Sequence, residues 1–543
     1  MCGIFFALSR HGHIAPDEST HALLRNRGPD RTGLHQPVLS REDGTELHAT
    51  FLSTVLSLRG TEIVSQPLVD ASTASVLCWN GEAWSINRDA VTGNDSKLVF
   101  DRLLKACADA SRSSKSAVVE LLSHIRGPDC LGRRSLLHKS TPDGALVLSS
   151  VCDNATGEAW AEVEANGIYF VDLNDFADSS SVTHIPHARL PKTPTAELLF
   201  FLPFPPMNRE NPSSHEDIHG AAIELGNALR RSLTLRTHHV REAFENSASD
   251  PSPRAAKVAV LFSGGLDCTI LARLCHDLLP LEEDIDLLNV AFENPRVHGK
   301  LEAGVSPYEL CPDRITGRDS HAELERVCPG RCWRFVEVNV PYTETVAHRA
   351  KVMALMHPHN TEMDLSISYA LYFASRGVGF TSTSNDALEA YTSTACVLLS
   401  GLGADELFGG YQRHETAFAR NSYPGLMQEL ELDFERLGKR NLGRDDRVIS
   451  DSGKEVRFPF LDENFIALAL QLSVGQKCDF GQPEHRPAGR PDIAIEPAKR
   501  VLRVLAAELG MSGAAVKKKR AIQFGARTAK METGKTKGTH VLS

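Results

Sequence analysis

The stretch KVAVLFSGGLDCTILARLCHDLL, residues 257–279, decides the fold, because it predicts a strand, a glycine turn and a helix. Its start, KVAVLF, is a nearly continuous apolar run, which is typical of a strand buried on both faces. SGGLDC (263–268) then places two glycines at the helix N-terminus, where backbone N–H groups and the helix dipole attract anions. Ser263 adds a hydroxyl, and the carboxylate of Asp267 can hold magnesium against phosphates. The turn predicts a phosphate-binding loop, with a plain tight turn as the alternative. It is not a Walker loop, since GxxxxGK[ST] is absent from the chain.

Strands and helices alternate around this stretch. An amphipathic helix is expected over 218–240, and apolar strands over 285–292, 334–340 and 396–401. Alternation of helices with fully apolar strands indicates a parallel sheet covered on both faces. We therefore expect an α/β domain over 218–530 and a polar, disordered tail over 531–543.

The first part of the chain follows a different pattern. Short β-type runs such as CGIFFAL, ATFLSTVLSL and GALVLSSV are separated by Gly, Asp and Pro turns, with a helix expected over 96–110. This pattern indicates stacked antiparallel sheets in an α+β domain over 2–183. The Pro-rich stretch 184–217 is interpreted as a linker.

Composition and charge exclude several classes of protein. The net charge of −10 argues against nucleic acid as a partner, because such sites need clustered Lys and Arg. No apolar run approaches the roughly 20 residues of a membrane span. The N-terminus lacks the basic start and cleavage site of a signal peptide. We therefore expect a cytoplasmic protein with no membrane partner, and the twelve scattered cysteines fit reduced thiols there.

Two segments invite a metal site without supporting one. Cys311, Cys328 and Cys332 lack the second close pair typical of zinc, so free thiols in a loop are favoured. His357 and His359 have no further ligands at suitable spacing, and we expect an exposed loop there.

The chain begins MCGIFFALSRHG, with a cysteine directly after the initiator methionine. Cysteine is small enough for methionine aminopeptidase to expose it, which would leave a thiol and an α-amino group on one residue. Such a residue is a nucleophile with its own base, because the thiolate attacks carbonyl carbons and the amine moves the proton. The alternative is that Cys2 is only the small apolar start of a strand.

Several motifs resemble one enzyme family and occur in its order. SGGLD (263–267) looks like the pyrophosphate loop of ATP pyrophosphatases, and SGLGADELFGGY (400–411) is similar to the asparagine synthetase signature SGxGxDExFGGY. EVRFPFLD (455–462) resembles the R-x-PFLD stretch of that family. Near the N-terminus, CGI, RGPD (27–30) and WNGEAW (79–84) resemble the class II glutamine amidotransferase domain.

On these residues the chain is identified as a member of the asparagine synthetase family, from Cys2 to about Lys530. KRAIQFGARTAK (519–530) and RGPDC (126–130) are similar to the eukaryotic asparagine synthetase domain-containing proteins. The resemblance implies an Ntn-hydrolase-like sandwich of antiparallel sheets and a parallel-sheet synthetase domain of the PP-loop type. It implies glutamine, ATP and aspartate as small-molecule substrates, and it leaves a homodimer open.

For the N-terminal domain, the resemblance implies that Cys2 attacks the side-chain amide of glutamine. The oxyanion would be stabilised by the Asn80 side chain and the Gly81 N–H, which are otherwise a strong hairpin-turn signal. Arg59 would pair with the glutamine α-carboxylate, whereas Asp95 and Glu82 would contact its α-ammonium. The products would be glutamate and ammonia.

For the C-terminal domain, the resemblance implies that Mg-ATP adenylates aspartate, which ammonia then converts to asparagine. The residues implied for this site are Ser263, Gly264, Gly265 and Asp267 at the pyrophosphate, Asp405 as a second magnesium ligand, Leu261 and Val290 at the adenine, and Ser400 and Gly401 near the nucleotide.

Three departures from the family pattern leave other functions open. Leu402 stands where the family has a glutamate that accepts a proton, and loss of a general base typically costs about 10²–10⁴-fold in rate. Ala521 stands opposite the family's catalytic lysine, although Lys519 or Arg520 could reach the phosphates. Cys268 replaces a serine. The alternatives are a nucleotide-binding scaffold without synthetase activity and a glutamine-dependent ligase for another carboxylate.

Overall fold

The computed structural model describes residues 1–87, 89–109, 111, 113–126, 129–153, 159–188, 200–201, 204–213, 216–241, 255–302, 304–382, 387–482, 486, 493–531 and 537–542. Contacts divide the chain into two units. The first unit comprises Met1–Leu202, Met353–His359 and Gly438–Glu455, and the second comprises Pro203–Val352, Asn360–Leu437 and Val456–Ser543. Two segments of the predicted second domain therefore belong to the first unit.

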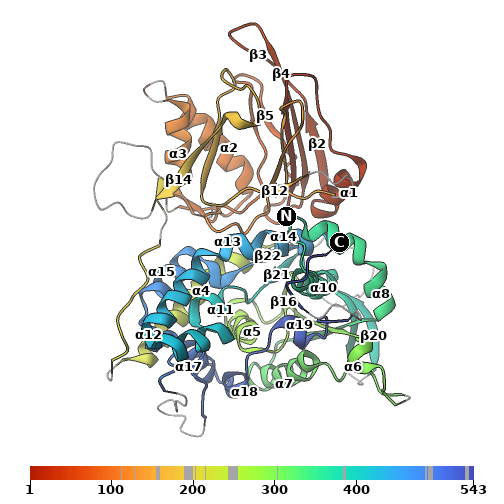
Figure 1. Ribbon diagram of the computed structural model, residues 1–543, viewed down its shortest axis with the longest axis vertical. Helices are drawn as coiled ribbons and strands as arrows, with labels where there is room; N and C mark the ends of the chain where they lie inside the picture. Colours follow the sequence, from red (N-terminus) through yellow and green to blue (C-terminus); the bar gives the residue numbers. More distant parts are fainter. Residues whose placement is uncertain are drawn as a thin grey trace. The chain divides into compact units, whose positions relative to one another are not determined.

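A seven-stranded sheet forms the centre of the first unit, in the order β12-β10-β11-β1-β4-β2, with β3 paired to β4. Its neighbouring strands run antiparallel, and β1 lies between β4 and β11. Figure 1 labels β2, β3, β4 and β12 of this sheet. The strands are β1 (Gly3–Ser9), β2 (Arg31–His35), β3 (Val38–Ser40), β4 (Glu46–Val55), β10 (Leu137–Ser140), β11 (Leu146–Ser149) and β12 (Ala161–Glu162).

Shorter sheets and helices complete the first unit. The short strands are β5 (Leu68–Asp70), β6 (Ser75–Leu77), β7 (Ser85–Ile86), β8 (Asp89–Ala90), β9 (Ile125–Arg126), β13 (Gly167–Val171), β14 (Val182–Ala188) and β15 (Phe200–Phe201). The helices are α1 (Glu18–Arg27), α2 (Asp95–Cys107), α3 (Ser114–His124) and α14 (Leu442–Ser450). Most of β14 and all of β15 fall within the predicted linker, where they pair in parallel.

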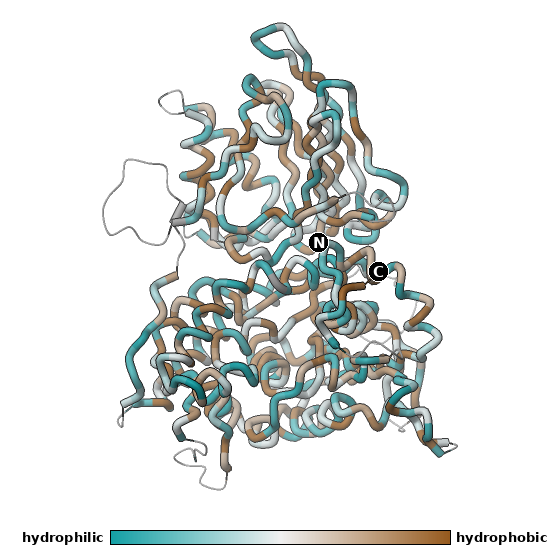
Figure 2. The backbone as a smooth tube through the Cα atoms, viewed as in Figure 1, coloured by the Kyte–Doolittle hydropathy of each residue, from teal (hydrophilic) through white to brown (hydrophobic). Residues whose placement is uncertain are grey.

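Apolar side chains on one face of the large sheet form a buried cluster that packs against Phe176. Leu8, Leu47, Ala49 and Leu146 are its other buried members. Figure 2 shows apolar residues recurring along these strands, as expected for a sheet with one face on a core. The continuous β-type runs of the sequence thus form strands because their apolar side chains have this cluster to pack against.

The second unit is built on a sheet in the order β20-β19-β18-β17-β16-β21-β22. The pairs β16–β17, β16–β21 and β17–β18 are parallel, whereas β19 joins antiparallel to β18 and β20. All eight residues of β17 are buried, as in a strand covered on both faces. The strands are β16 (Val258–Leu261), β17 (Ile285–Phe292), β18 (Trp333–Val340), β19 (Val378–Ser382), β20 (Leu388–Thr392), β21 (Val397–Leu399) and β22 (Glu455–Arg457). The expected fold class, α/β joined to α+β, is confirmed.

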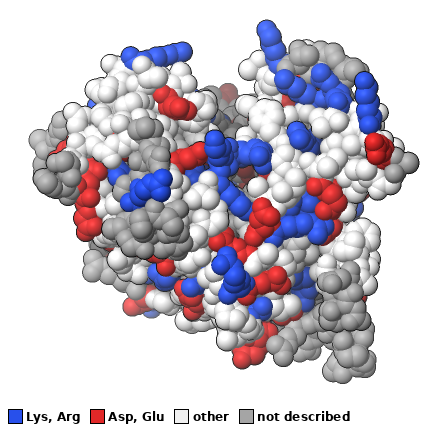
Figure 3. Space-filling view, turned by 90° about the horizontal axis from the view of Figure 1, so that it is seen from below, with Lys and Arg blue, Asp and Glu red and all other residues white. Residues whose placement is uncertain are grey.

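Helices surround this sheet in the second unit. They are α4 (Ile218–Thr237), α5 (Leu266–Leu278), α6 (Pro295–His298), α7 (Pro312–Val327), α8 (Tyr342–Ala347), α10 (Glu362–Arg376), α11 (Ala404–Phe408), α12 (Gln412–Glu435), α15 (Glu463–Gln471), α16 (Val474–Lys477), α17 (Arg500–Glu508), α18 (Ser512–Val516) and α19 (Ile522–Gly525). Two further helices, α9 (Arg349–Met356) and α13 (Leu437–Arg440), have residues in both units. Among the described residues, no helix combines the length and the apolar character needed to cross a membrane. On the face shown in Figure 3, Lys and Arg side chains lie among Asp and Glu side chains.

The tail differs from the expected disorder where the structure describes it. The N–H of Leu542 donates to the carbonyl of Asn360 (2.7 Å), and Thr361 forms a β-bridge with Val541. Backbone hydrogen bonds therefore order residues 537–542. Residues 532–536 and 543 of the predicted tail, 189–199 of the predicted linker and the Gly-Pro pair at 127–128 lie outside the described residues.

Two histidines also differ from expectation, because His357 and His359 are partly buried rather than exposed. They belong to the segment Met353–His359 of the first unit, where His359 lies 3.7 Å from the Glu162 carboxylate. All twelve cysteines of the chain are free, in agreement with the expected reduced thiols.

The segment Gly438–Glu455 is held in the first unit by buried charges. The Arg27 guanidinium lies 2.9 Å from the Asp446 carboxylate, and both side chains are at most 1% exposed. Arg27 also donates to the Ser450 hydroxyl (2.6 Å). On the same helix, Arg447 donates to the Ser135 hydroxyl (2.8 Å). Because buried charges are costly unless paired, these bonds fix the segment to α1 and to the loop before β10.

Substitution Asp446→Ala is expected to destabilise the first unit by about 3–5 kcal/mol, because it leaves the Arg27 charge buried and unpaired. The control is Lys439→Ala, which removes an exposed ion pair to Glu164 in the same segment (2.9 Å) and should cost less than about 1 kcal/mol. Urea unfolding measures both. Equal losses of stability in the two variants would contradict a stabilising role for the buried Arg27–Asp446 pair.

Candidate functional site

Cys2 lies directly before β1, and packing on Gly3 fixes its position. The Gly3 N–H donates to the Thr54 hydroxyl (3.1 Å). A Cβ at Gly3 would approach the Thr54 hydroxyl oxygen to 2.4 Å, so only glycine fits. Gly28 of RGPD is equally confined, because its Cβ would approach the Thr54 backbone to 2.3 Å. The two glycines therefore bring the strand start against β4 and leave Cys2 at the end of the sheet.

A pocket surrounds Cys2 and contains every residue predicted for glutamine binding. Its lining consists of Met1, Cys2, Val55, Leu56, Ser57, Leu58, Arg59, Val64, Gln66, Trp79, Asn80, Gly81, Glu82, Asn94, Asp95, Ser96 and Glu455. Residues from β4, the loop after it, the 79–82 turn and the start of α2 thus converge on one thiol.

Some polar groups of this pocket already have hydrogen-bond partners within the protein, whereas one amide oxygen has none among the described residues. Arg59 donates to the Glu82 carboxylate and the Ala83 carbonyl, both at 3.2 Å. Asp95 accepts from the Trp79 indole (3.0 Å) and from the Ala83 N–H (2.8 Å). In contrast, Asn80 Oδ1 is buried without a hydrogen-bond partner in the described structure. A buried amide oxygen of this kind favours a bound polar ligand.

Burial dominates the electrostatics around the thiol. It raises the pKa of Cys2, against the opposing effect of the nearby amino terminus. It lowers the pKa of the Met1 amino group, which favours the neutral amine. Burial also raises the pKa of Asp95, although Ala83 and Trp79 donate to its carboxylate. The thiol therefore needs a base to ionise, and the amino terminus in the same pocket has a lowered pKa.

Two further polar residues of the pocket, Gln66 and Glu455, were not assigned to this site from the sequence. The Gln66 amide nitrogen lies 4.0 Å from the Cys2 sulfur, and its Oε1 accepts from the Trp79 N–H (2.6 Å). Glu455 opens the EVRFPFLD motif, which the sequence assigned to the other domain. No local sequence pattern places either residue beside Cys2.

The glycine loop between β16 and α5 packs against α7. Gly264 has φ +73°, and a Cβ there would lie 2.2 Å from the Thr316 carbonyl oxygen. The Thr316 hydroxyl donates to the Ser263 carbonyl, and the Ser320 hydroxyl donates to the Gly264 carbonyl, both at 2.8 Å. With its carbonyls held by α7, the loop is fixed, and Gly265 begins the helix as its N-cap. Such a turn suits a phosphate group.

Two carboxylates and two lysines meet beside this loop. The Lys499 ammonium lies 2.6 Å from Asp267 and 2.8 Å from Asp405. Lys519 lies 2.8 Å from the second oxygen of Asp405. Asp267 Oδ1 is buried without a hydrogen-bond partner among the described residues, which fits a cation ligand. Both aspartates predicted to hold magnesium are therefore brought together.

The charges in this cluster shift one another's protonation. Burial raises the pKa of Asp267, but at Asp405 the charges of Lys499 and Lys519 outweigh burial and hold the pKa below its usual value. Burial lowers the pKa of Lys499, yet the two aspartates outweigh it and raise this pKa. Lys499 also has φ +57°, a strained conformation for this residue type that is typical of functional sites.

The other predicted nucleotide residues follow neighbouring strands. Leu261 ends β16, and Val290 lies in the adjacent β17. Ser400 and Gly401 follow β21, which pairs with β16 on its other side. A Cβ at Gly401 would lie 2.9 Å from the Asp267 Cβ, so this turn packs closely on α5. The carboxyl ends of these strands therefore share one edge, where parallel sheets bind ligands.

Comparison with known proteins identifies the relatives of this chain. The asparagine synthase family pattern matches residues 419–535. The asparagine synthetase domain-containing protein 1 of Bos taurus is 34% identical, with 99% of this chain and 97% of the relative covered. The Saccharomyces cerevisiae asparagine synthetase domain-containing protein is 32% identical over 91% of this chain and 86% of its own length. The chain belongs to the asparagine synthetase domain-containing family. A putative glutamine-hydrolyzing asparagine synthetase of Methanocaldococcus jannaschii is 27% identical, with 62% and 57% covered.

The three residues that depart from the asparagine synthetase pattern can be located in the structure. Leu402 is partly buried one residue after Gly401, and its N–H donates to the Ser400 hydroxyl (3.3 Å). Ala521 is the N-cap of α19. Cys268 is buried, and its thiol donates to the Gly265 carbonyl (3.3 Å). Lys519, two residues before Ala521, reaches Asp405, so a lysine is present in the cluster despite the alanine.

Lys499 is the main residue of this family member's second site that the sequence did not reveal. It lies in EPAKRVLR, which carries no recognised motif, and directly precedes α17. Its N–H donates to the Phe408 carbonyl (2.9 Å), which directs the side chain to the aspartates from outside the glycine loop. Only the fold brings it there.

Substitution Gly264→Ala is expected to lower stability by about 1–3 kcal/mol, because alanine is strained at φ +73° and its methyl group would meet the Thr316 carbonyl. Gly265→Ala is the control, since its Cβ would meet only the Ser263 hydroxyl at 3.3 Å. It should cost less than about 1 kcal/mol. Thermal unfolding compares them, and a larger loss for Gly265→Ala would exclude the described loop.

Proposed function

We propose that this chain releases ammonia from glutamine at Cys2 and uses Mg-ATP in the second unit to activate a carboxylate for amidation. Aspartate is the acceptor suggested by the family, which would make the product asparagine. The observation that supports the first half is the pocket in which Cys2, Arg59, Asn80, Gly81, Glu82 and Asp95 meet. The second half is supported by the glycine loop with Asp267 and Asp405 beside it.

In the proposed amide step, removal of Met1 exposes the amine of Cys2. The Cys2 sulfur attacks the glutamine amide carbon while its proton passes to the amine. Burial lowers the pKa of the amino terminus in this pocket. Asn80 and the Gly81 N–H would stabilise the oxyanion. The carbon–nitrogen bond then breaks, the proton passes to the leaving nitrogen, and ammonia departs. Water hydrolyses the thioester to glutamate.

Cys2→Ala is expected to reduce glutamate release from glutamine by about 10³-fold or more, because no other group can form the thioester. Cys78→Ala is the matched control, since Cys78 is a neighbouring, partly buried thiol. It should retain activity. A glutaminase assay on both proteins measures this, and activity that survives Cys2→Ala would remove Cys2 from the mechanism.

In the proposed synthetase step, the loop Ser263–Gly265 holds the pyrophosphate of ATP at the N-terminus of α5. Lys499 and Lys519 supply positive charge beside this loop. They would replace the family's catalytic lysine, whose position Ala521 occupies here. Asp267 and Asp405 would hold magnesium, which neutralises phosphate charge when bound. These residues orient the triphosphate while the acceptor carboxylate attacks the α-phosphate and pyrophosphate leaves.

Leu402 favours a second candidate, a chain that binds nucleotide without making asparagine. Its side chain has no group that accepts the proton when ammonia attacks the acyl-adenylate. The same residue is compatible with a ligase for another carboxylate. An assay with glutamine, ATP, magnesium and aspartate distinguishes these functions. Pyrophosphate and asparagine appear together only if the family reaction operates.

Leu402→Glu is expected to raise asparagine formation by about 10²-fold, because it restores a carboxylate where the family has one. Leu402→Gln has nearly the same shape without a basic group and should give no such gain. Amino-acid analysis of the reaction mixture measures the product. If neither variant makes asparagine while ATP still raises the melting temperature, the result supports a nucleotide-binding scaffold without synthetase activity.

A further inference from the structure

Glu455 is a buried carboxylate in the Cys2 pocket that the proposed reaction does not use. It is the first residue of β22, far from Cys2 in sequence, and only 3% of it is exposed. It nevertheless lines the same pocket as Met1 and Cys2. A buried acid beside a reacting group generally alters the charge of that group.

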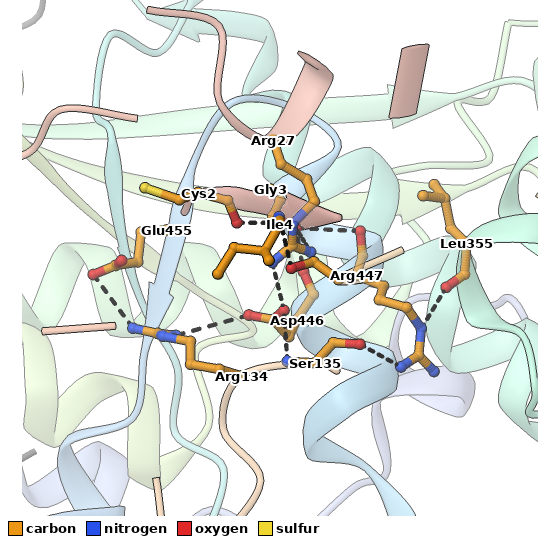
Figure 4. A network of polar contacts seen from close by, with 12 residues as sticks. Cys2, Gly3, Ile4, Arg27, Arg134, Ser135, Leu355, Asp446, Arg447 and Glu455 are labelled. Atoms are coloured by element: carbon orange, nitrogen blue, oxygen red, sulfur yellow. Dashed lines mark hydrogen bonds and ion pairs between the residues drawn. The ribbon is translucent and has the colours of Figure 1, made fainter. Parts of the chain in front are cut away.

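A chain of alternating charges connects Glu455 to the amino end, as Figure 4 shows. Arg134 lies 3.4 Å from the Glu455 carboxylate and 3.8 Å from Asp446. Asp446 pairs with Arg27 at 2.9 Å. The Arg27 Nε then donates to the Cys2 carbonyl at 3.4 Å. Two acids and two arginines thus form one network that ends at the Cys2 carbonyl.

The charged groups that face the amino terminus come from several elements. They are Glu455 from β22, the Cys2 thiol, Arg27 from α1 and Arg134 from the loop before β10. Burial is the largest effect and lowers the pKa of the amine; Glu455 is the largest charge effect and raises this pKa. The two arginines act in the same direction as burial. Asp446 pairs with both arginines.

We propose that Glu455, held by Arg134, is a positioning residue that orients the α-amino group of Cys2 and sets its protonation during glutamine hydrolysis. This inference rests on the proposed function of Cys2 as nucleophile. In the intact chain the free amine belongs to Met1, and removal of Met1 transfers it to Cys2 in the same pocket. When the thiol proton moves to the amine, the Glu455 carboxylate accepts a hydrogen bond from the ammonium. The proton then passes to the leaving nitrogen, so Glu455 neither gains nor loses one.

The test uses full-length protein whose first residue is shown by mass spectrometry to be Cys2. The lower-pH limb of kcat/KM for glutamine hydrolysis reports the amine of the free enzyme. Glu455→Gln removes the negative charge, so the pKa of the amine falls and this limb moves down by about one pH unit. Arg134→Met removes a positive charge that lowers the pKa of the amine, so this pKa rises and the limb moves up.

A conservative variant separates this role from a merely structural one. Glu455→Asp keeps the charge, and its limb should stay near that of the unchanged protein even if kcat falls. The pH dependence of Cys2 alkylation by iodoacetamide reads the same groups without turnover, so it serves for any variant with little activity. Melting temperatures identify variants that fail to fold, and Glu455→Asp and Glu455→Gln then carry the test.

The outcomes distinguish the two proposals. If the unchanged protein hydrolyses glutamine but neither the activity limb nor the alkylation limb moves in Glu455→Gln, Glu455 has no part in the protonation of the amine. Shifts of Glu455→Gln and Arg134→Met in one common direction would overturn it as well. If the unchanged protein releases no glutamate at any pH, the proposed glutaminase function fails, whereas the alkylation profiles still decide the role of Glu455.

Discussion

The buried ion pair between Arg27 and Asp446 is the interaction on which the first unit depends. It joins residues that are 419 positions apart in the sequence, and neither side chain reaches solvent. A charge in such a place is stable only with its partner, so the pair requires Gly438–Glu455 to fold together with the first two hundred residues. The glycines at positions 3 and 28 bring α1 and β1 close enough to β4 for Arg27 to reach Cys2 as well as Asp446.

The second unit shows the same principle with the signs exchanged. Asp267 and Asp405 follow different strands, and like charges so close would repel one another. Lys499 lies between them, and its strained backbone suggests that the surrounding fold maintains this arrangement. Each site is therefore a small group of opposed charges at the end of a sheet. In the first, the charges surround a thiol and an amine; in the second, they surround a glycine loop suited to phosphate.

Local sequence predicted the parts of the structure that depend on neighbouring residues. The apolar run 257–262, the paired glycines and the following helix specify β16 and α5 almost alone, because burial and backbone freedom are local properties. The residues around Cys2 were expected from the family resemblance, and the structure brings them into one pocket. Lys499 and Glu455 were not assigned to their sites, since each acts through a contact that exists only after distant segments pack. β14 and residues 537–542 were missed for a related reason, because these short segments gain order from pairing with other parts of the chain.

The interleaving of the chain also restricts how such proteins can be divided. Met353–His359 and Gly438–Glu455 are encoded within the second half, yet they complete the first unit. A gene fragment that ended near position 202 would encode β1, α1 and the thiol but neither Asp446 nor Glu455. The Cys2 pocket is therefore encoded by both halves of the gene, and an exchange of one half between relatives would combine the thiol of one with the acids of the other.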